Sequence, residues 1–114
     1  MPAPDKYVQF CLDLLSPLGL ISSKYMFGGW CLYCDGTPFA IVADGALFLK
    51  GGSNNIPDFE ARGMKPFKPF PDQDLTMKYF ETPPEFFEDA DLRTQLSRGS
   101  IEAGRAKAKK KKKR

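Results

Sequence analysis

Two cysteines stand three residues apart, at Cys31 and Cys34, in a spacing that can bind zinc or form a redox disulfide. Zinc would need further ligands, but Cys11 is the only other cysteine and the sequence contains no histidine. A redox pair would open a helix, whereas this stretch is typical of a β-strand, in which positions i and i+3 point to opposite faces. We therefore expect two unrelated small side chains, with no metal site and no cofactor.

Two other groups of residues could do chemistry. Gly28–Gly29 could belong to a phosphate loop, but no G-x-x-x-x-G-K-[ST] pattern follows and the next segment is typical of a strand. Acidic residues gather between positions 81 and 91 without the spacing of a calcium loop, and first helical turns favour negative charge. We expect a bend at the glycines, solvent-exposed helix caps at the acids, and no catalytic residue.

The C-terminal end is strongly basic. Positions 105–114 hold eight of the 17 basic residues, which leaves nine basic against 14 acidic residues before them, a net charge of −5. Such a run attracts phosphate backbones through counterion release without reading sequence, although a solubilising tail with no particular partner has the same composition. The candidate nucleic-acid residues are Arg105, Lys107, Lys109, Lys110, Lys111, Lys112, Lys113 and Arg114.

Turn patterns predict the sheet that positions these groups. Asp35–Gly36 and Asp44–Gly45 each separate short apolar runs, as tight β-hairpin turns do. They predict a three-strand antiparallel meander, whose middle strand is apolar on both sides and should be central and covered on both faces. Alternating patterns before and after the meander predict two more strands. The predicted strands span 20–27, 30–34, 39–43, 46–50 and 75–81.

Helices are predicted on either side of these strands. Pro4–Asp5 opens the first, a short helix begins at Pro57, and a C-terminal helix begins near Asp89 or Asp91 and runs through Ile101. The predicted fold class is α+β, a mostly antiparallel sheet of about five strands flanked by N- and C-terminal helices. We expect one domain over residues 1–104 and a disordered basic tail over 105–114, because that tail has no apolar residue except two alanines.

The overall composition limits the class of protein. A length of 114 residues fits one domain, and 42% hydrophobic residues can build one core. The sequence has no run of about 18 apolar residues, and its N-terminus lacks the basic and apolar regions of a secretory signal. An odd number of cysteines argues against a disulfide framework. We expect a cytoplasmic protein without membrane contact.

Several segments occur together in an order that matches one known family. They are Met26–Trp30, Leu32–Tyr33, the two Asp-Gly turns, Pro57–Gly63 and Met77–Glu81. Over roughly residues 5–100 the chain resembles the N-terminal domain of the TfoX (Sxy) family of competence regulators. The residues that carry the resemblance, which we interpret as structural, are Met26, Phe27, Gly28, Gly29, Asp35, Gly36, Asp44 and Gly45.

The resemblance implies an α+β fold in a bacterial cytoplasmic protein. It also implies a regulatory role, since full-length members are linked to competence-gene transcription alongside the cyclic-AMP receptor protein. Those members carry a second, helix-hairpin-helix domain, and we expect this chain to be a stand-alone, single-domain member. The family pattern implies no catalytic residues.

The leading hypothesis is a non-enzymatic regulatory or adaptor domain, associated with transcription or competence. It would bind a protein partner, such as a component of the transcription machinery, and its basic tail would add non-specific attraction for nucleic acid. One alternative is a small-ligand-binding protein or enzyme with a pocket beside the sheet, using Tyr33, Tyr79 or Cys34 as polar anchors; perturbed titratable groups in a pocket would favour it. Another is a self-associating module, which sedimentation would reveal.

Overall fold

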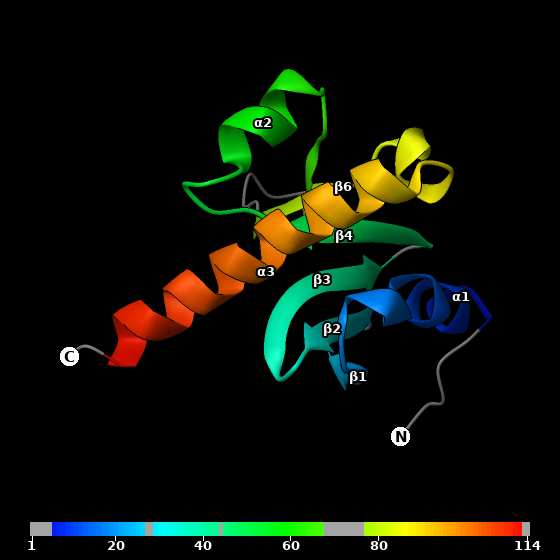
Figure 1. The fold of residues 1–114 in the computed structure, drawn as a ribbon, viewed down its shortest axis with the longest axis horizontal. Helices are drawn as coiled ribbons and strands as arrows, with labels where there is room; N and C mark the ends of the chain where they lie inside the picture. The colour runs from blue at the N-terminus through cyan, green and yellow to red at the C-terminus, as the bar shows by residue number, and fades with distance from the viewer. Residues whose placement is uncertain (1–5, 27–28, 44, 68–76, 113–114) are drawn as a thin grey trace.

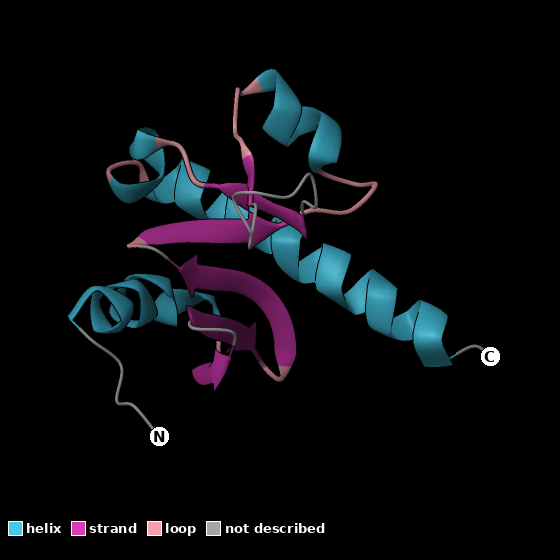
Figure 2. Ribbon diagram, turned by 180° about the vertical axis from the view of Figure 1, so that it is seen from behind, coloured by secondary structure: helices cyan, strands magenta, loops and turns pink. Residues whose placement is uncertain are grey.

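The computed structural model describes residues 6–26, 29–43, 45–67 and 77–112 (Figure 1). One antiparallel sheet carries helices on one of its faces. Helices α1 (Lys6–Leu15) and α3 (Ala90–Lys112) cross in front of the strands in Figure 1, and the strands lie in front of these helices in the reverse view of Figure 2. The predicted α+β class is confirmed.

The sheet has six strands within the described ranges, in the order β1-β2-β3-β4-β6-β5, and every neighbouring pair is antiparallel. The five predicted strands are present, although the first residues of the 75–81 prediction lie outside the described ranges. The sixth strand, β5, is a two-residue edge strand that begins with a proline, as suits a residue with no N–H to donate. The strands are β1 (Ile21–Met26), β2 (Gly29–Cys34), β3 (Thr37–Ala43), β4 (Ala46–Lys50), β5 (Pro66–Phe67) and β6 (Met77–Glu81).

The predicted meander is present and includes one strand more than expected, because β1 also pairs with β2. Asp35 and Gly36 have φ values of 50° and 84°, so both central residues of the β2–β3 turn take the positive φ that a primed turn needs. Gly29 allows close pairing of strands, since a Cβ there would lie 2.6 Å from the carbonyl oxygen of Val42 on β3. Asp44, predicted to form the next turn, lies outside the described residues.

The helices begin near their predicted positions. The 3₁₀ turn η1 (Ser16–Leu18) follows α1, where Ser16–Pro17 should stop it. Helix α2 (Ile56–Ala61) begins one residue before the predicted Pro57, and a 3₁₀ turn, η2 (Pro84–Phe87), begins at Pro84. Asp89 caps α3, since its Oδ1 accepts the N–H groups of Asp91 (3.0 Å) and Leu92 (3.1 Å). No helix in the described part of the chain is long and apolar enough to cross a membrane.

The core lies between the sheet and these helices. Leu32, Ala40, Leu49 and Phe80 form one row across β2, β3, β4 and β6, as their pairing shows, and all four are buried. The helices meet this face with buried side chains that include Val8, Cys11, Leu15, Phe86, Leu96 and Ile101. β3 is central as predicted, but the helices cover only one of its faces (Figure 2).

The long helix extends further along the chain than the sequence predicts. The sequence predicts a disordered tail over residues 105–114, whereas α3 continues without a break as far as Lys112. Packing of Leu96, Ile101 and Ala103 stabilises the first turns, and a helix already formed extends at little cost through alanine, lysine and arginine, which have high helix propensity. The basic residues up to Lys112 therefore belong to a helix, although they lack the apolar side chains that would dock it.

Candidate functional site

The basic end of α3 leaves the body just after Gly104. Gly104 is buried against β3, where a Cβ would lie 2.5 Å from the carbonyl oxygen of Pro38, whereas Arg105 and Lys107 are exposed. Figures 1 and 2 show the C-terminal end of α3 projecting past the strands. Of the predicted nucleic-acid residues, the structure describes the side chains of Arg105 and Lys107 and places Lys109–Lys112 on the helix; Lys113 and Arg114 lie outside the described residues.

A pocket of about 430 Å³ lies where α3 passes the ends of β4 and β6. Lys50 from β4, Lys78 from β6 and Lys107 from α3 line it, and the loop of residues 51–54 closes one side. No acidic side chain is among the described residues that line this pocket. We call it the lysine pocket, defined by Lys50, Lys78, Tyr79, Lys107 and residues 51–54.

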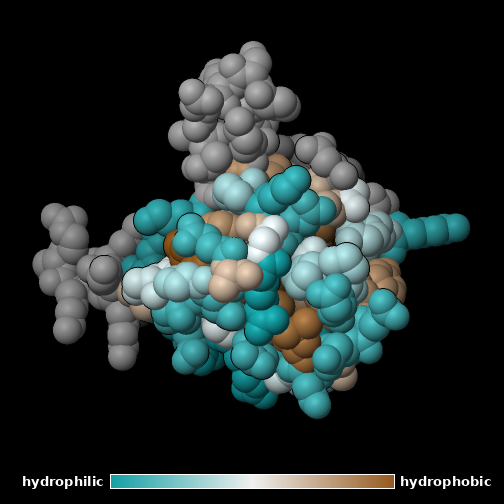
Figure 3. Space-filling view, turned by 90° about the horizontal axis from the view of Figure 1, so that it is seen from above, coloured by the Kyte–Doolittle hydropathy of each residue, from teal (hydrophilic) through white to brown (hydrophobic). Residues whose placement is uncertain are grey.

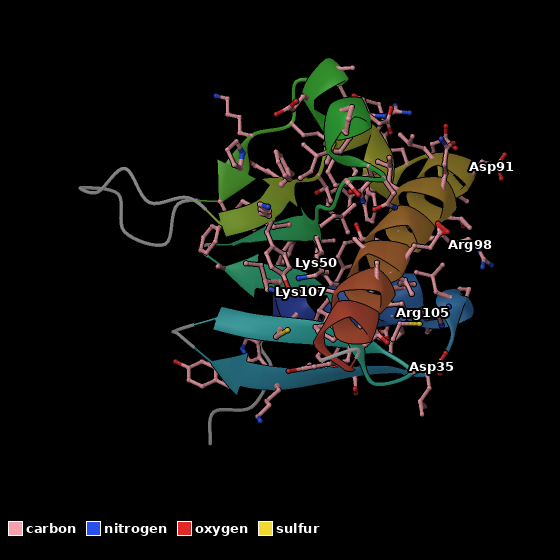
Figure 4. All side chains as sticks on the ribbon, turned by 90° about the vertical axis from the view of Figure 1, so that its left-hand side faces the viewer. Asp35, Lys50, Asp91, Arg98, Arg105 and Lys107 are labelled. Carbon is pink, nitrogen blue, oxygen red and sulfur yellow. The ribbon has the colours of Figure 1, made fainter. Side chains whose placement is uncertain are left out.

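Lys50 and Tyr79 form the inner wall of the lysine pocket. They are cross-strand partners, and the Lys50 ammonium nitrogen lies 4.9 Å from the centroid of the Tyr79 ring, a cation–π distance. Burial lowers the pKa of Lys50, and the neighbouring charge of Lys107 lowers this pKa further. Burial also raises the pKa of Tyr79 to about 12, so its phenol is neutral at physiological pH. Figure 4 shows Lys50 and Lys107 side by side.

The loop beside these side chains is fixed to the sheet and to α3. The Gly51 N–H donates to the Lys78 carbonyl (2.7 Å), and the side-chain oxygen of Asn55 accepts the Gly52 N–H (2.7 Å). The Asn54 side chain donates to the Gly99 carbonyl on α3 (3.0 Å). The pocket therefore has a preformed wall. From the sequence this stretch reads only as a loop, since its partners lie far along the chain.

The two cysteines of the C-x-x-C pattern lie on opposite faces of the sheet, as predicted. Cys31 pairs with Lys24 and Ile41 outside the core cluster, whereas the Cys34 thiol lies on the helix side, 3.9 Å from the Leu18 carbonyl oxygen. Burial raises the pKa of both thiols. Among the residues that the structure describes, no group of three or more His, Cys, Asp or Glu side chains could hold a metal ion.

The residues that carry the family resemblance lie at the hairpin ends. Asp35, in the β2–β3 turn, is bonded to the residue before β1, because its Oδ1 accepts the Leu20 N–H (3.2 Å) and its own N–H donates to the Leu20 carbonyl (2.8 Å). Met26 pairs with Gly29, and Gly45 has a φ of 71°. Phe27, Gly28 and Asp44 lie outside the described residues.

The structure places one of the predicted polar anchors in the lysine pocket and places the predicted acidic caps at the surface. Of the three anchors, Tyr79 lines the lysine pocket, but Tyr33 and Cys34 do not. The structure adds Lys50, Lys78 and Lys107 from three separate elements, which no local spacing could have indicated. The acidic residues predicted to be solvated are all exposed: Glu81, Glu85, Glu88, Asp89 and Asp91.

Comparison with known proteins identifies the family. A family model described as the TfoX N-terminal domain matches residues 13–104. The chain belongs to the TfoX N-terminal domain family. This TfoX match includes every described strand and the packed part of α3, and it ends at the residue where the basic end leaves the body.

One curated relative is the DNA transformation protein TfoX1 of Aliivibrio fischeri (strain ATCC 700601 / ES114). It is 32% identical over 77 residues, which are 67% of this chain and 36% of the relative. The chain thus matches only about a third of the length of that TfoX protein.

Proposed function

We propose that this chain is a non-enzymatic regulatory or adaptor domain, associated with competence and transcription in the bacterial cytoplasm. Its folded body binds a protein partner belonging to the transcription machinery. The basic end of α3 adds sequence-independent attraction for nucleic acid. The observation that carries this proposal is the TfoX N-terminal domain match over residues 13–104, which spans the whole sheet. The name of the Aliivibrio relative, a DNA transformation protein, supports the association with competence.

The distribution of charge supports the nucleic-acid part of the proposal. Residues 1–104 carry a net charge of −5, and the eight basic residues beyond them are concentrated at one end of the chain. A cationic helix end that projects from the body can approach phosphate groups and release their counterions. No base-reading element is needed for this attraction.

The surface supports contact with a protein partner at the β1 edge. Among the described residues, the large hydrophobic side chains that stay exposed are Phe10 (48%), Leu20 (75%) and Tyr25 (37%), on or beside α1 and β1. β1 is also the outermost strand on its side of the sheet. Elsewhere, on the face seen in Figure 3, hydrophobic areas are small and separated by hydrophilic residues. A partner strand could pair with the β1 edge and cover these side chains.

An affinity experiment tests the proposal. The full chain serves as bait in extracts of the source cell, beside a variant in which Lys109–Lys113 are replaced by glutamine, and both extracts are treated with nuclease. Substitution is preferable to truncation because α3 is continuous through this region. We expect both baits to retain RNA polymerase or transcription-factor subunits, and the Leu20→Ser/Tyr25→Ser variant to retain much less of them.

Either of two other results would contradict the proposal. If nuclease-treated extracts yield no transcription component with either bait, the protein-partner role fails. If material is retained only through the terminal lysines, the function reduces to electrostatic attraction.

A further inference from the structure

The lysine pocket concentrates positive charge without compensation. Among the described residues the ion pair that forms is between Asp58 on α2 and Arg62 just after it, so Lys50, Lys78 and Lys107 have no carboxylate partner in the lysine pocket. Burial next to a like charge disfavours the charged form of Lys50. A buried cation whose neighbours are also cations is stabilised when an anion binds between them.

The position of Lys50 distinguishes this cluster from ordinary surface lysines. Its side chain is half-buried and lies over the Tyr79 ring. The loop that faces it is fixed by hydrogen bonds to β6 and α3. On the helix side, Ala103 and Ala106 are small, so Lys107 can reach the pocket without obstruction. The site therefore has concave shape, fixed walls and unpaired charge.

We propose that the lysine pocket binds a phosphate group, carried by a small phosphorylated compound or by the terminal phosphate of a nucleic-acid strand. Each ammonium group can donate up to three hydrogen bonds, and phosphate oxygens accept charge-assisted hydrogen bonds from such groups. Tyr79 remains a neutral hydroxyl donor at the inner wall. Binding is non-covalent, and it does not depend on the regulatory role proposed above.

Both sources of phosphate fit the surroundings of the pocket. A volume of about 430 Å³ can accept a nucleotide-sized compound. A strand end bound in the pocket would leave the neighbouring phosphates of the strand beside the next turns of α3, where Lys109–Lys112 follow Lys107 on the same helix. The two sources differ in one respect, since only the strand should depend on those terminal lysines.

Titrations of the full chain with inorganic pyrophosphate, with AMP and with a short 5′-phosphorylated single strand test the proposal at constant ionic strength. Amide chemical shifts of residues 51–54 report binding at the pocket. We expect Lys50→Gln and Lys107→Gln each to weaken binding about tenfold, the effect of losing one charge-assisted hydrogen bond. Lys65→Gln removes the same charge from a β-edge position outside the lysine pocket and should leave the affinity within about twofold.

The Lys109–Lys113→Gln variant then separates the two sources. Unchanged pyrophosphate and AMP affinity would identify a small phosphorylated compound as ligand. The ligand would be the nucleic-acid strand if, of the three probes, only the 5′-phosphorylated strand binds, and if this binding is lost both with Lys107→Gln and with the terminal substitutions. The proposal is overturned if Lys65→Gln weakens binding as much as Lys107→Gln does, or if none of the three probes shifts the 51–54 amides. Because Lys107 is exposed, its variant tests the site even if Lys50→Gln fails to fold.

Discussion

The two parts of α3 meet the rest of the molecule in opposite ways. From Ala90 to Gly104 the helix is held by packing, with Leu96, Ile101 and Gly104 buried against the sheet. Beyond Gly104 the helix is exposed at residues 105–107, and six of the eight residues from Arg105 to Lys112 are basic. One continuous helix therefore contains a segment whose side chains pack against the sheet and a segment whose side chains are mostly positively charged. Substitutions in the first should change stability, and substitutions in the second should change binding.

The largest expected effect is on the packed part. Ile101→Ala should lower the free energy of unfolding by about 2–4 kcal/mol, because it removes a buried side chain and leaves a cavity beneath α3. Lys107→Ala, six residues further along the helix, should change it by no more than about 0.5 kcal/mol. Urea unfolding followed by circular dichroism measures both. Similar losses for the two variants would mean that the helix is not divided as described.

The basic part should show the reverse behaviour. Replacing Lys109–Lys113 with glutamine should weaken binding of duplex DNA on the order of a hundredfold at low salt, and should reduce the slope of log affinity against log salt by up to about five. Fluorescence anisotropy from 50 to 200 mM salt provides the measurement. Ile101→Ala, studied where it remains folded, is the control and should keep the wild-type slope. A slope that survives the lysine substitutions would place DNA contacts on the body.

The boundary between the two parts can be tested with two glycines. A Cβ at Gly104 would lie 2.5 Å from the Pro38 carbonyl oxygen and 2.7 Å from the Thr37 methyl group, so Gly104→Ala should destabilise the fold by about 1–2 kcal/mol. At Gly99 the nearest atom would be the Asn55 amide nitrogen at 3.5 Å. Gly99→Ala should therefore stabilise the helix by about 0.5–1 kcal/mol. Thermal unfolding compares the pair, and equal effects would contradict the close contact at Gly104.

The smallest expected effect concerns Lys50, where the packed sheet meets the basic helix. The pKa of Lys50 is lower in the folded protein than its usual 10.5, so between these values the unfolded chain binds more protons. The free energy of unfolding should therefore rise with pH over that interval. Lys50→Met should lose this dependence and gain a few tenths of a kcal/mol at pH 7, since it removes a disfavoured charge.

Denaturation at several pH values, with Lys65→Met as the control for removing one lysine, checks the Lys50 prediction. The curves of wild type and Lys50→Met should converge as the pH approaches 10.5, the usual pKa of lysine. A Lys50→Met variant that keeps the wild-type pH slope would show that Lys50 carries no desolvation cost.

Local patterns allowed the architecture to be predicted from the sequence. Asp35–Gly36 specifies a turn because its two residues tolerate positive φ, and Asp89 specifies a helix start because its carboxylate accepts free N–H groups. These signals depend on neighbouring residues in the sequence, and they were sufficient to predict the meander and the start of α3. The continuation of α3 to Lys112 was not predicted, because the sequence analysis considered only packing, whereas a helix anchored at Ile101 needs no further docking to continue.

The lysine pocket could not be predicted in the same way. Lys50, Lys78 and Lys107 come from three elements, and only the sheet order and the path of α3 bring them together. Tyr79 could be named as a possible anchor because a tyrosine in a strand has a polar end. Its link to Lys50 needed the β4–β6 register, which the sequence does not specify because β5 and the segment before β6 intervene.

The continuity of α3 also has an electrostatic consequence. At a rise of about 1.5 Å per residue, Lys112 lies about 12 Å beyond Gly104 along the helix axis. The screening length in physiological salt is about 8 Å. A phosphate held at the helix tip is therefore beyond the range at which the acidic body, with its net charge of −5, would repel it. A flexible tail would fold back and neutralise that body, whereas a rigid helix holds the two charges apart.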